Sequence, residues 1–185
     1  MILFKYLDHL PAIPDELLVD FYNPDDIEFE QGIETYRKSG IFRRHSLKSP
    51  LDKWLRENIV AATAPKSSHF TGLQEMTAHN GVGEILPHTD FRKWSLNYIL
   101  ECGGDKVSTE FYKMPGKDLF LGPNVRLDDP APYAPVYKVV IQPHRWHIIN
   151  ANVLHAVRHI ESARRAVSLG LMEFDPFPII KNHTD

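Results

Sequence analysis

The chain has 185 residues, the length of one ordinary domain, which hides roughly 70% of its unfolded surface and needs no disulfide or partner to stabilise its core. Hydrophobic residues make up 43% and charged residues 24%, which excludes disordered and fibrous classes. The formal net charge of −3 removes the electrostatic case for general nucleic-acid binding.

A single cysteine, Cys102, excludes a disulfide framework and a cysteine-based zinc site within one chain. No apolar run approaches the roughly 20 residues of a membrane span. Lys5 and Asp8 interrupt the apolar start of the sequence, which is unlike a secretion signal. We therefore expect a cytoplasmic protein that does not enter a membrane.

The first part of the chain, residues 1–67, is predicted to be mixed and partly helical. One helix is expected to begin at Pro14, because Asp15 and Glu16 would then fall in its first turn, where the helix dipole favours acids. A second is expected near Pro50, which suits a first helical turn and precedes apolar residues at helical spacing.

Residues 68–175 have a different texture, in which short apolar segments alternate with Gly, Pro and Asn. Segments rich in β-branched and aromatic residues between turn signals predict antiparallel strands in a sandwich or barrel. No repeat or domain linker interrupts the chain, so we expect one domain over residues 1–185. The predicted strands are 70–77, 84–86, 96–100, 107–112, 136–142, 146–149, 153–157 and 166–171.

A His-x-Asp pair is the most informative motif in the sequence. In an extended strand, residues two apart point to the same side, so His88 and Asp90 would project together. His155, on another predicted strand, is a candidate third ligand. Two histidines and one carboxylate leave open positions on a metal, as in non-haem Fe(II) oxygenases. An isolated His-x-Asp pair, by contrast, is more often a surface pair than a metal site.

The context of this pair resembles the 2-oxoglutarate- and Fe(II)-dependent oxygenases, most closely their prolyl-hydroxylase-like branch. The resemblance extends over about residues 84–171 and implies a double-stranded β-helix, a jelly-roll barrel like that of the cupins, preceded by the N-terminal helices. The fold class expected is therefore mainly β. The matching residues, in order, are His88-Thr-Asp90, the strand 95–100, Gly103-Gly104, Thr109-Glu-Phe111, His155-Ala-Val157 and Arg164.

The resemblance also implies roles for these residues. His88, Asp90 and His155 would bind Fe(II), and an arginine of the last strand would bind the distal carboxylate of 2-oxoglutarate through two hydrogen bonds. Alternation favours Arg164, because it shares a face with small residues that leave room for a ligand. Arg165 is the alternative if the strand register is shifted by one residue.

Two further residues are assigned to 2-oxoglutarate by the same resemblance. Tyr98 matches a strand tyrosine whose hydroxyl reaches the distal carboxylate, although a half-buried strand tyrosine without such a role is the alternative. Thr109 matches the threonine that follows the glycine pair. Here the spacing departs from the family, because residues 105–108 stand where the family has one residue.

The activity that the resemblance implies is hydroxylation of an unactivated C–H bond, with O2 as cosubstrate and succinate and CO2 as products. The substrate would be a small molecule or a peptidyl residue, and its identity and the oligomeric state stay open. One alternative is a binding module on the same barrel that performs no redox step. Another is a cupin-like metal enzyme without 2-oxoglutarate, which would have no use for Arg164.

Other features are interpreted without a catalytic role. Residues 114–135 are predicted to form a long proline-rich loop, which would act as a lid over the substrate or as an inert surface excursion. The histidines His144, His147 and His159 are expected on loops or on the surface. The basic cluster is expected on a solvated face, and contact with an anionic substrate is the alternative. It consists of Arg37, Lys38, Arg43, Arg44 and Lys48.

Overall fold

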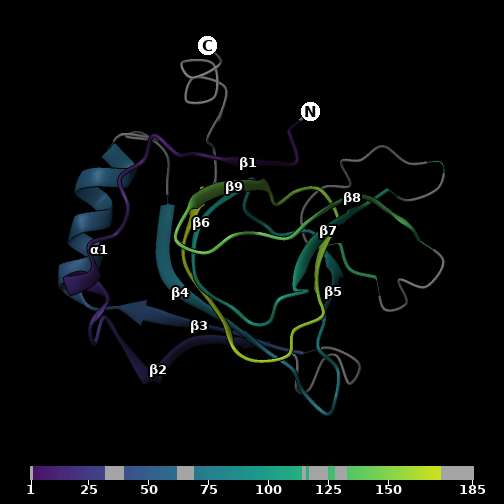
Figure 1. The fold of residues 1–185 in the computed structure, drawn as a ribbon, viewed down its shortest axis with the longest axis horizontal. Coiled ribbons are helices and arrows are strands. Elements are labelled where there is room, and N and C mark those ends of the chain that lie inside the picture. The colour runs from purple at the N-terminus through teal and green to yellow at the C-terminus, as the bar shows by residue number, and fades with distance from the viewer. Residues whose placement is uncertain are drawn as a thin grey trace.

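Two antiparallel β-sheets face each other in the computed structural model of the chain (Figure 1). The structure describes residues 2–31, 40–61, 69–113, 116, 125–127 and 133–171. The architecture is mostly β, as the sequence predicts. Within the described ranges, no helix has the length and apolarity to cross a membrane.

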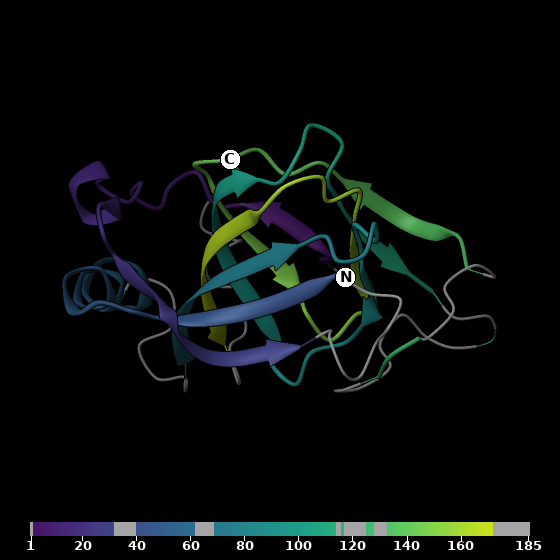
Figure 2. The same ribbon diagram turned by 90° about the horizontal axis from the view of Figure 1, so that it is seen from below.

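The larger sheet has seven strands in the order β1-β9-β6-β11-β4-β3-β2, and Figure 2 shows β2, β3, β4 and β11 side by side. The smaller sheet has four strands in the order β5-β10-β7-β8. The strands of the larger sheet are β1 (Phe4–Tyr6), β2 (Tyr22–Gln31), β3 (Ile41–Leu47), β4 (His69–Thr77), β6 (Trp94–Cys102), β9 (Trp146–Asn150) and β11 (Arg164–Leu171). Those of the smaller sheet are β5 (Ile85–His88), β7 (Ser108–Tyr112), β8 (Pro135–Val139) and β10 (His155–Arg158).

The eight strands from β4 to β11 pair in a nested way. β4 pairs with β11, β5 with β10, β6 with β9 and β7 with β8. These are the eight strands predicted from the sequence, with their ends displaced by a few residues. The nesting brings segments that are distant in the sequence next to each other, so residues of β5 and β10 can share one site.

Both predicted helices exist, and the first is a single 3-10 turn, η1 (Asp15–Leu18). The second is α1 (Ser49–Leu55), with Pro50 in its first turn, which continues into the π-helical turn η2 (Arg56–Val60). The N-terminal part also contributes β1, β2 and β3, which the sequence analysis did not predict. β2 contains Pro24 and acidic residues, which are poor strand formers but are tolerated on the edge strand that β2 forms.

The two faces of the larger sheet have different neighbours. On β11, Val167, Leu169 and Leu171 pack with Leu51 and Leu55 of α1 in the main apolar core. The alternate residues of β11, including Arg164 and Ala166, line a cavity on the other face. Figure 1 shows α1 outside the larger sheet, on the side away from β5 and β7. The cavity therefore lies between the two sheets, and the helix covers the opposite face.

Candidate functional site

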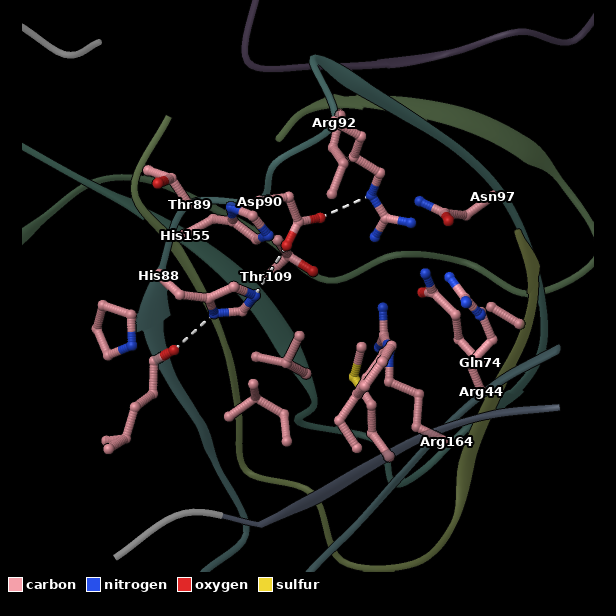
Figure 3. Close-up of a pocket in the computed structure, with 18 of the residues that line it drawn as sticks. Arg44, Gln74, His88, Thr89, Asp90, Arg92, Asn97, Thr109, His155 and Arg164 are labelled. Carbon is pink, nitrogen blue, oxygen red and sulfur yellow. Dashed lines mark hydrogen bonds and ion pairs between the residues drawn. The ribbon is translucent and has the colours of Figure 1, made fainter. Parts of the chain in front are cut away.

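A cavity of about 500 Å³ lies between the sheets and receives side chains from both (Figure 3). Most of its wall is apolar, with residues such as Phe42, Met76 and Ile99 from the larger sheet. The polar residues include the three candidate metal ligands and several arginines. A mainly apolar cavity with a few convergent polar groups is typical of a small-molecule or active site.

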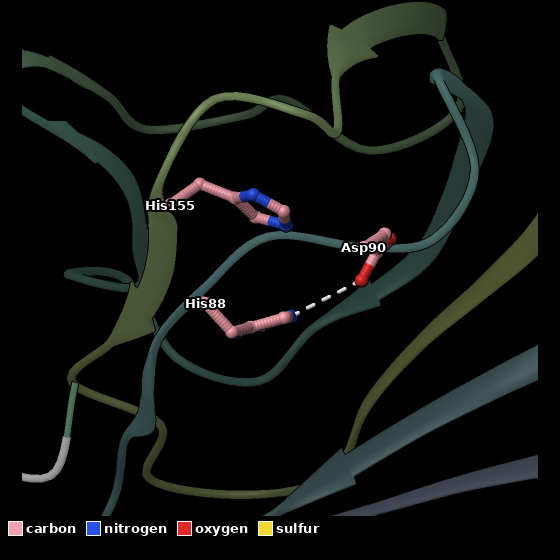
Figure 4. A group of neighbouring side chains, drawn as sticks. All are labelled: His88, Asp90 and His155. Carbon is pink, nitrogen blue, oxygen red and sulfur yellow. Dashed lines mark ion pairs between the residues drawn. The ribbon is translucent and has the colours of Figure 1, made fainter. Parts of the chain in front are cut away.

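The structure brings His88, Asp90 and His155 together at one end of this cavity (Figure 4). One potential ligand atom from each residue lies within 4.8 Å of the others. His88 and His155 are direct partners in the antiparallel ladder between β5 and β10, and their ring centroids are 4.6 Å apart. Three side chains in this arrangement could hold a metal ion.

Asp90 reaches this group from outside the strand, which differs from the prediction that His88 and Asp90 share an extended strand. β5 ends at His88. The Asp90 N–H then donates to the carbonyl of Ala151 (2.8 Å), at the turn between β9 and β10. The carboxylate is therefore positioned by a backbone contact with the segment that leads into His155.

The hydrogen bonds of both imidazoles determine which nitrogen is available. His88 Nδ1 donates to the carbonyl of Leu86 (2.8 Å), and His155 Nδ1 donates to the carbonyl of Val153 (2.9 Å). Because a carbonyl oxygen can only accept, Nδ1 carries the proton and Nε2 of the neutral ring has a free lone pair. His88 Nε2 lies 3.4 Å from Asp90 Oδ1. A cation or a proton between these two atoms would relieve the repulsion of their lone pairs.

The protonation states also suit a divalent cation. Burial lowers the pKa of His155 to about 4, and the neighbouring His88 adds to this shift. Burial alone would raise the pKa of Asp90, but the Arg92 guanidinium beside it and the contact with His88 hold that pKa well below its usual range. At neutral pH the site thus presents a neutral His155 and an ionised Asp90, the forms that bind metals.

Arg92 orients the carboxylate and is a residue that the sequence analysis missed. Its side chain is only 9% exposed, and Nε donates to Asp90 Oδ2 at 2.6 Å. With its amide oxygen turned toward Arg92, Gln74 accepts from both terminal nitrogens at 2.9 Å. Because Oδ2 is engaged by Arg92, Oδ1 is the carboxylate oxygen that faces His88.

Arg164 lies buried in the cavity wall, 4% exposed, as alternation along the strand predicts. No carboxylate of a described residue forms an ion pair with it, and its Nη1 makes one long contact, to the carbonyl of Cys102 (3.5 Å). Burial lowers the pKa of Arg164 to about 10. Arg165 instead points away from the cavity and pairs with Glu75 (2.7 Å) and Glu101 (2.9 Å). A buried guanidinium without an acid is suited to an anionic ligand.

Of the two other predicted site residues, the structure places Thr109 in the cavity and Tyr98 outside it. Thr109 is 3% exposed on β7, since the turn between β6 and β7 absorbs the extra residues. Tyr98 was expected to reach 2-oxoglutarate, and the structure corrects this expectation. Its ring packs against Trp146 (ring centroids 5.1 Å apart) in the core beside α1. The physical reason is the two-residue period of β6, which turns Asn97 and Ile99 into the cavity and Tyr98 away.

The position of His147 also differs from the prediction. It was expected on the surface but is 1% exposed on β9 and lines the cavity, whereas His144 and His159 are exposed as predicted. Burial and the charge of Arg164 lower the pKa of His147 from 6.5 to about 3. The prediction failed because β9 is buried on both of its faces.

The buried His147 predicts that acid destabilises the protein. The unfolded chain binds a proton at His147 as pH falls through 6.5, whereas the folded protein resists protonation down to about 3. The free energy of unfolding should therefore fall on acidification, and His147 should account for about 2 kcal/mol of the loss between pH 7.5 and 5. Urea unfolding of His147→Gln at both pH values should show a correspondingly smaller loss. The control His79→Gln should keep the wild-type difference; an unchanged loss in His147→Gln would contradict the assignment.

The predicted basic cluster divides between surface and cavity. Arg43 pairs with Glu30 and Glu75, and Lys48 pairs with Asp20, as expected for a solvated face. Arg44 also pairs with a surface acid, Glu28, and is half-buried, and it lines the cavity in addition. Its neighbours in the sequence alternate faces along β3, which separates it from Arg43. Arg37 and Lys38 lie outside the described residues.

The predicted lid, residues 114–135, lies mostly outside the described residues, and its role stays a prediction. Of its described residues (116, 125–127 and 133–135), the segment 125–127 runs beside the metal-ligand segment. The Thr89 N–H donates to the carbonyl of Val125 (2.8 Å), and the Leu127 N–H donates to the carbonyl of Pro87 (2.9 Å). Arg126 is thereby the antiparallel bridge partner of His88 and also lines the cavity.

Comparison with known proteins supports the fold and no more. No family model matches the chain, and no curated protein matches it. Among solved structures, the X-ray structure of E. coli ycfD is similar, with a TM-score of 0.50 and 11% sequence identity. The match covers 97% of this chain and 52% of that one, so this chain spans about half the length of the solved protein.

Proposed function

We propose that the protein is an Fe(II)- and 2-oxoglutarate-dependent oxygenase that hydroxylates a C–H bond of a small-molecule or peptidyl substrate. The observation that carries this proposal is the presence in one cavity of a His-Asp-His group and a buried arginine that no described carboxylate neutralises. The metal ligands alone would fit many metalloproteins. The additional arginine selects a cosubstrate with a carboxylate, as 2-oxoglutarate has.

The nested strand pairing supports the proposal at the level of the fold. Winding a long hairpin so that the first strand pairs with the last, and the second with the second last, generates a jelly roll. The pairs β4–β11, β5–β10, β6–β9 and β7–β8 follow this rule and fall alternately in the two sheets. We therefore propose that β4 to β11 form a double-stranded β-helix, to which β1, β2 and β3 add edge strands.

The residues at the candidate metal site fit Fe(II). Two imidazoles with bare Nε2 atoms and one carboxylate oxygen would supply the three protein ligands that non-haem Fe(II) oxygenases use. Arg92 and the two backbone carbonyls that accept from Nδ1 preorganise these ligands. His88, Asp90 and His155 would thus hold the metal.

When bound, iron and 2-oxoglutarate supply the oxidation: O2 gives one oxygen atom to the C–H bond and one to succinate, and CO2 leaves. The contribution of the chain is binding and orientation. Arg164 would bind the distal carboxylate of 2-oxoglutarate, for which its buried planar fork is suited. The apolar wall around Ile99 and Ala166 excludes water from that interaction. A metal enzyme without such a cosubstrate would leave Arg164 buried and unneutralised.

Turnover of 2-oxoglutarate tests the proposed function. The purified chain, loaded with Fe(II) and supplied with O2 and 2-oxoglutarate, should form succinate slowly even without a primary substrate. The rate should vanish when Zn(II), which has no redox chemistry, replaces Fe(II). Succinate is measured by NMR. The proposal fails if metal binds to the three ligands but 2-oxoglutarate neither raises the melting temperature nor is converted.

A further inference from the structure

The cavity carries an excess of positive charge that the proposed cosubstrates do not use. Among the described residues, its charged lining consists of four arginines, Arg44, Arg92, Arg126 and Arg164, and one acid, Asp90. The whole chain, in contrast, has a formal charge of −3. A cavity whose charged groups have mostly one sign and whose walls have a low dielectric constant attracts ligands of the opposite charge.

Two of these arginines have partners within the proposed function. Arg92 pairs with Asp90, and Arg164 would pair with 2-oxoglutarate. A divalent metal ion and the dianion of 2-oxoglutarate cancel each other, so loading the site with both does not reduce the excess. Of the other two, Arg44 forms an ion pair with Glu28, which does not belong to the cavity lining, and its remaining N–H groups are left for a ligand.

Arg44 is held in a defined position on the side of the cavity away from His88 and His155 (Figure 3). It is the ladder partner of Gln74 on β4, and its stem passes over Gly72, where an added Cβ would lie only 3.0 Å from the stem. Its guanidinium stacks on Phe70, 4.9 Å from the ring centroid. Arg92 lies 5.4 Å from the same centroid, so two cations share one aromatic ring.

The hydrogen bonds of Arg44 leave the two terminal nitrogens of its guanidinium available to a ligand. Nε donates to Glu28 Oε2 (2.9 Å), and Ser46 donates to the other oxygen of Glu28. In the described part of the chain, no residue accepts a hydrogen bond from the terminal nitrogens of Arg44. A guanidinium fixed through Nε and its flat face presents two terminal N–H groups in the geometry that binds a carboxylate.

We propose that the primary substrate is a carboxylic acid, bound as its anion by Arg44, with an apolar portion against Phe70. This inference rests on the proposed function and names the substrate class of that site. The acid would enter as a free small molecule or as the side chain of a peptide, which share this chemistry.

Binding of three probes of equal size tests the charge preference. The full chain is loaded with Mn(II) and N-oxalylglycine, an unreactive analogue of 2-oxoglutarate that occupies Arg164. Phenylacetate, 2-phenylethanol and phenethylamine are then titrated, and binding is followed by NMR chemical shifts. We expect phenylacetate to bind at least about tenfold more tightly than the alcohol or the amine. Equal binding of all three probes would overturn the proposal.

Matched arginine variants test whether Arg44 causes the preference for phenylacetate. Arg44→Met should abolish this preference. Arg43→Met should keep it, because Arg43 faces outward and pairs with Glu30 and Glu75. Arg44→Lys should bind phenylacetate with intermediate affinity, because the charge stays and the fork is lost. This second variant keeps the test valid if Arg44→Met unfolds. Retention of the full preference in Arg44→Lys and Arg44→Met would overturn the assignment.

Two further experiments complete the test. The first distinguishes a free acid from a peptidyl acid, and the second distinguishes failure of the anion site from failure of the proposed oxygenase function. Tighter binding of phenylacetate than of an acetylated and amidated aspartate supports a free acid, and the reverse supports a peptidyl one. The titrations are repeated without metal and analogue. An Arg44-dependent preference in a chain that binds neither Mn(II) nor N-oxalylglycine would support the anion site and overturn the oxygenase. Metal and analogue binding without that preference would overturn the anion site alone.

Discussion

Replacing His155 by alanine is expected to abolish binding of Fe(II) and of its redox-stable substitute Mn(II), and with it all conversion of 2-oxoglutarate. His155 supplies one of three ligand atoms that lie within 4.8 Å of one another, and its Nε2 is kept unprotonated by burial and by the Nδ1 contact with Val153. Losing an outer partner of a ligand weakens metal binding by about 10- to 100-fold, so losing the ligand itself should exceed that range. Titration with Mn(II), followed by electron paramagnetic resonance, measures the effect.

The controls for this experiment follow from the surroundings of each ligand. His79→Ala removes a histidine outside the cavity and should bind Mn(II) normally. His88→Ala should match His155→Ala. Asp90→Ala should also lose metal, but it leaves the guanidinium of Arg92 buried without its carboxylate, so we expect a lower melting temperature as well. Normal Mn(II) affinity in His155→Ala would exclude this residue as a ligand.

Replacing Arg164 by methionine is expected to weaken 2-oxoglutarate binding by about 2–5 kcal/mol, which corresponds to a loss of affinity of at least about 30-fold. The carboxylate of the cosubstrate would lose its partner in a cavity wall where the arginine is 4% exposed. The melting temperature without cosubstrate should stay unchanged or rise, because the variant removes a buried charge that no described acid neutralises. Calorimetric titration of the Mn(II)-loaded protein measures the affinity.

Arg165→Met is the matched control, since Arg165 is the next residue on β11 and pairs with Glu75 and Glu101 outside the cavity. It should bind 2-oxoglutarate like the wild type. Arg164→Lys should fall between the wild type and Arg164→Met, because the charge remains without the bidentate grip. A larger loss in Arg165→Met than in Arg164→Met would show that the cosubstrate binds elsewhere.

Local patterns in the sequence were sufficient for the strands from β4 to β11 and for the inward face of the last strand. Alternation along β11 predicted that Arg164 faces inward and that Val167, Leu169 and Leu171 pack against neighbouring helices. In the structure Arg164 lines the cavity and the three apolar residues pack with α1. Period-two alternation is a property of a single strand, so it can be read before the fold is known. The His-x-Asp pair was a candidate for the same reason, because its spacing is local. His155 was a candidate through its residue type and the family resemblance, since nothing local brings it beside His88.

Which side chains meet in the cavity between the two sheets depends on the tertiary fold. The family resemblance assigned Tyr98 to the site, but in the structure its neighbour Asn97 lines the cavity and Tyr98 packs in the core on the other face of β6. His147 was expected on a loop or on the surface, and nothing local reveals that a second sheet covers β9. For Arg44, the sequence left a solvated face and contact with an anionic substrate as alternatives, and only the fold shows that β3 borders the cavity. The pairing of Arg92 with Asp90, and the lack of a described acid beside Arg164, depend on which charges the nested strands bring together. The charge balance in a cavity depends on residues from several strands, so it cannot be predicted from any single segment of the sequence.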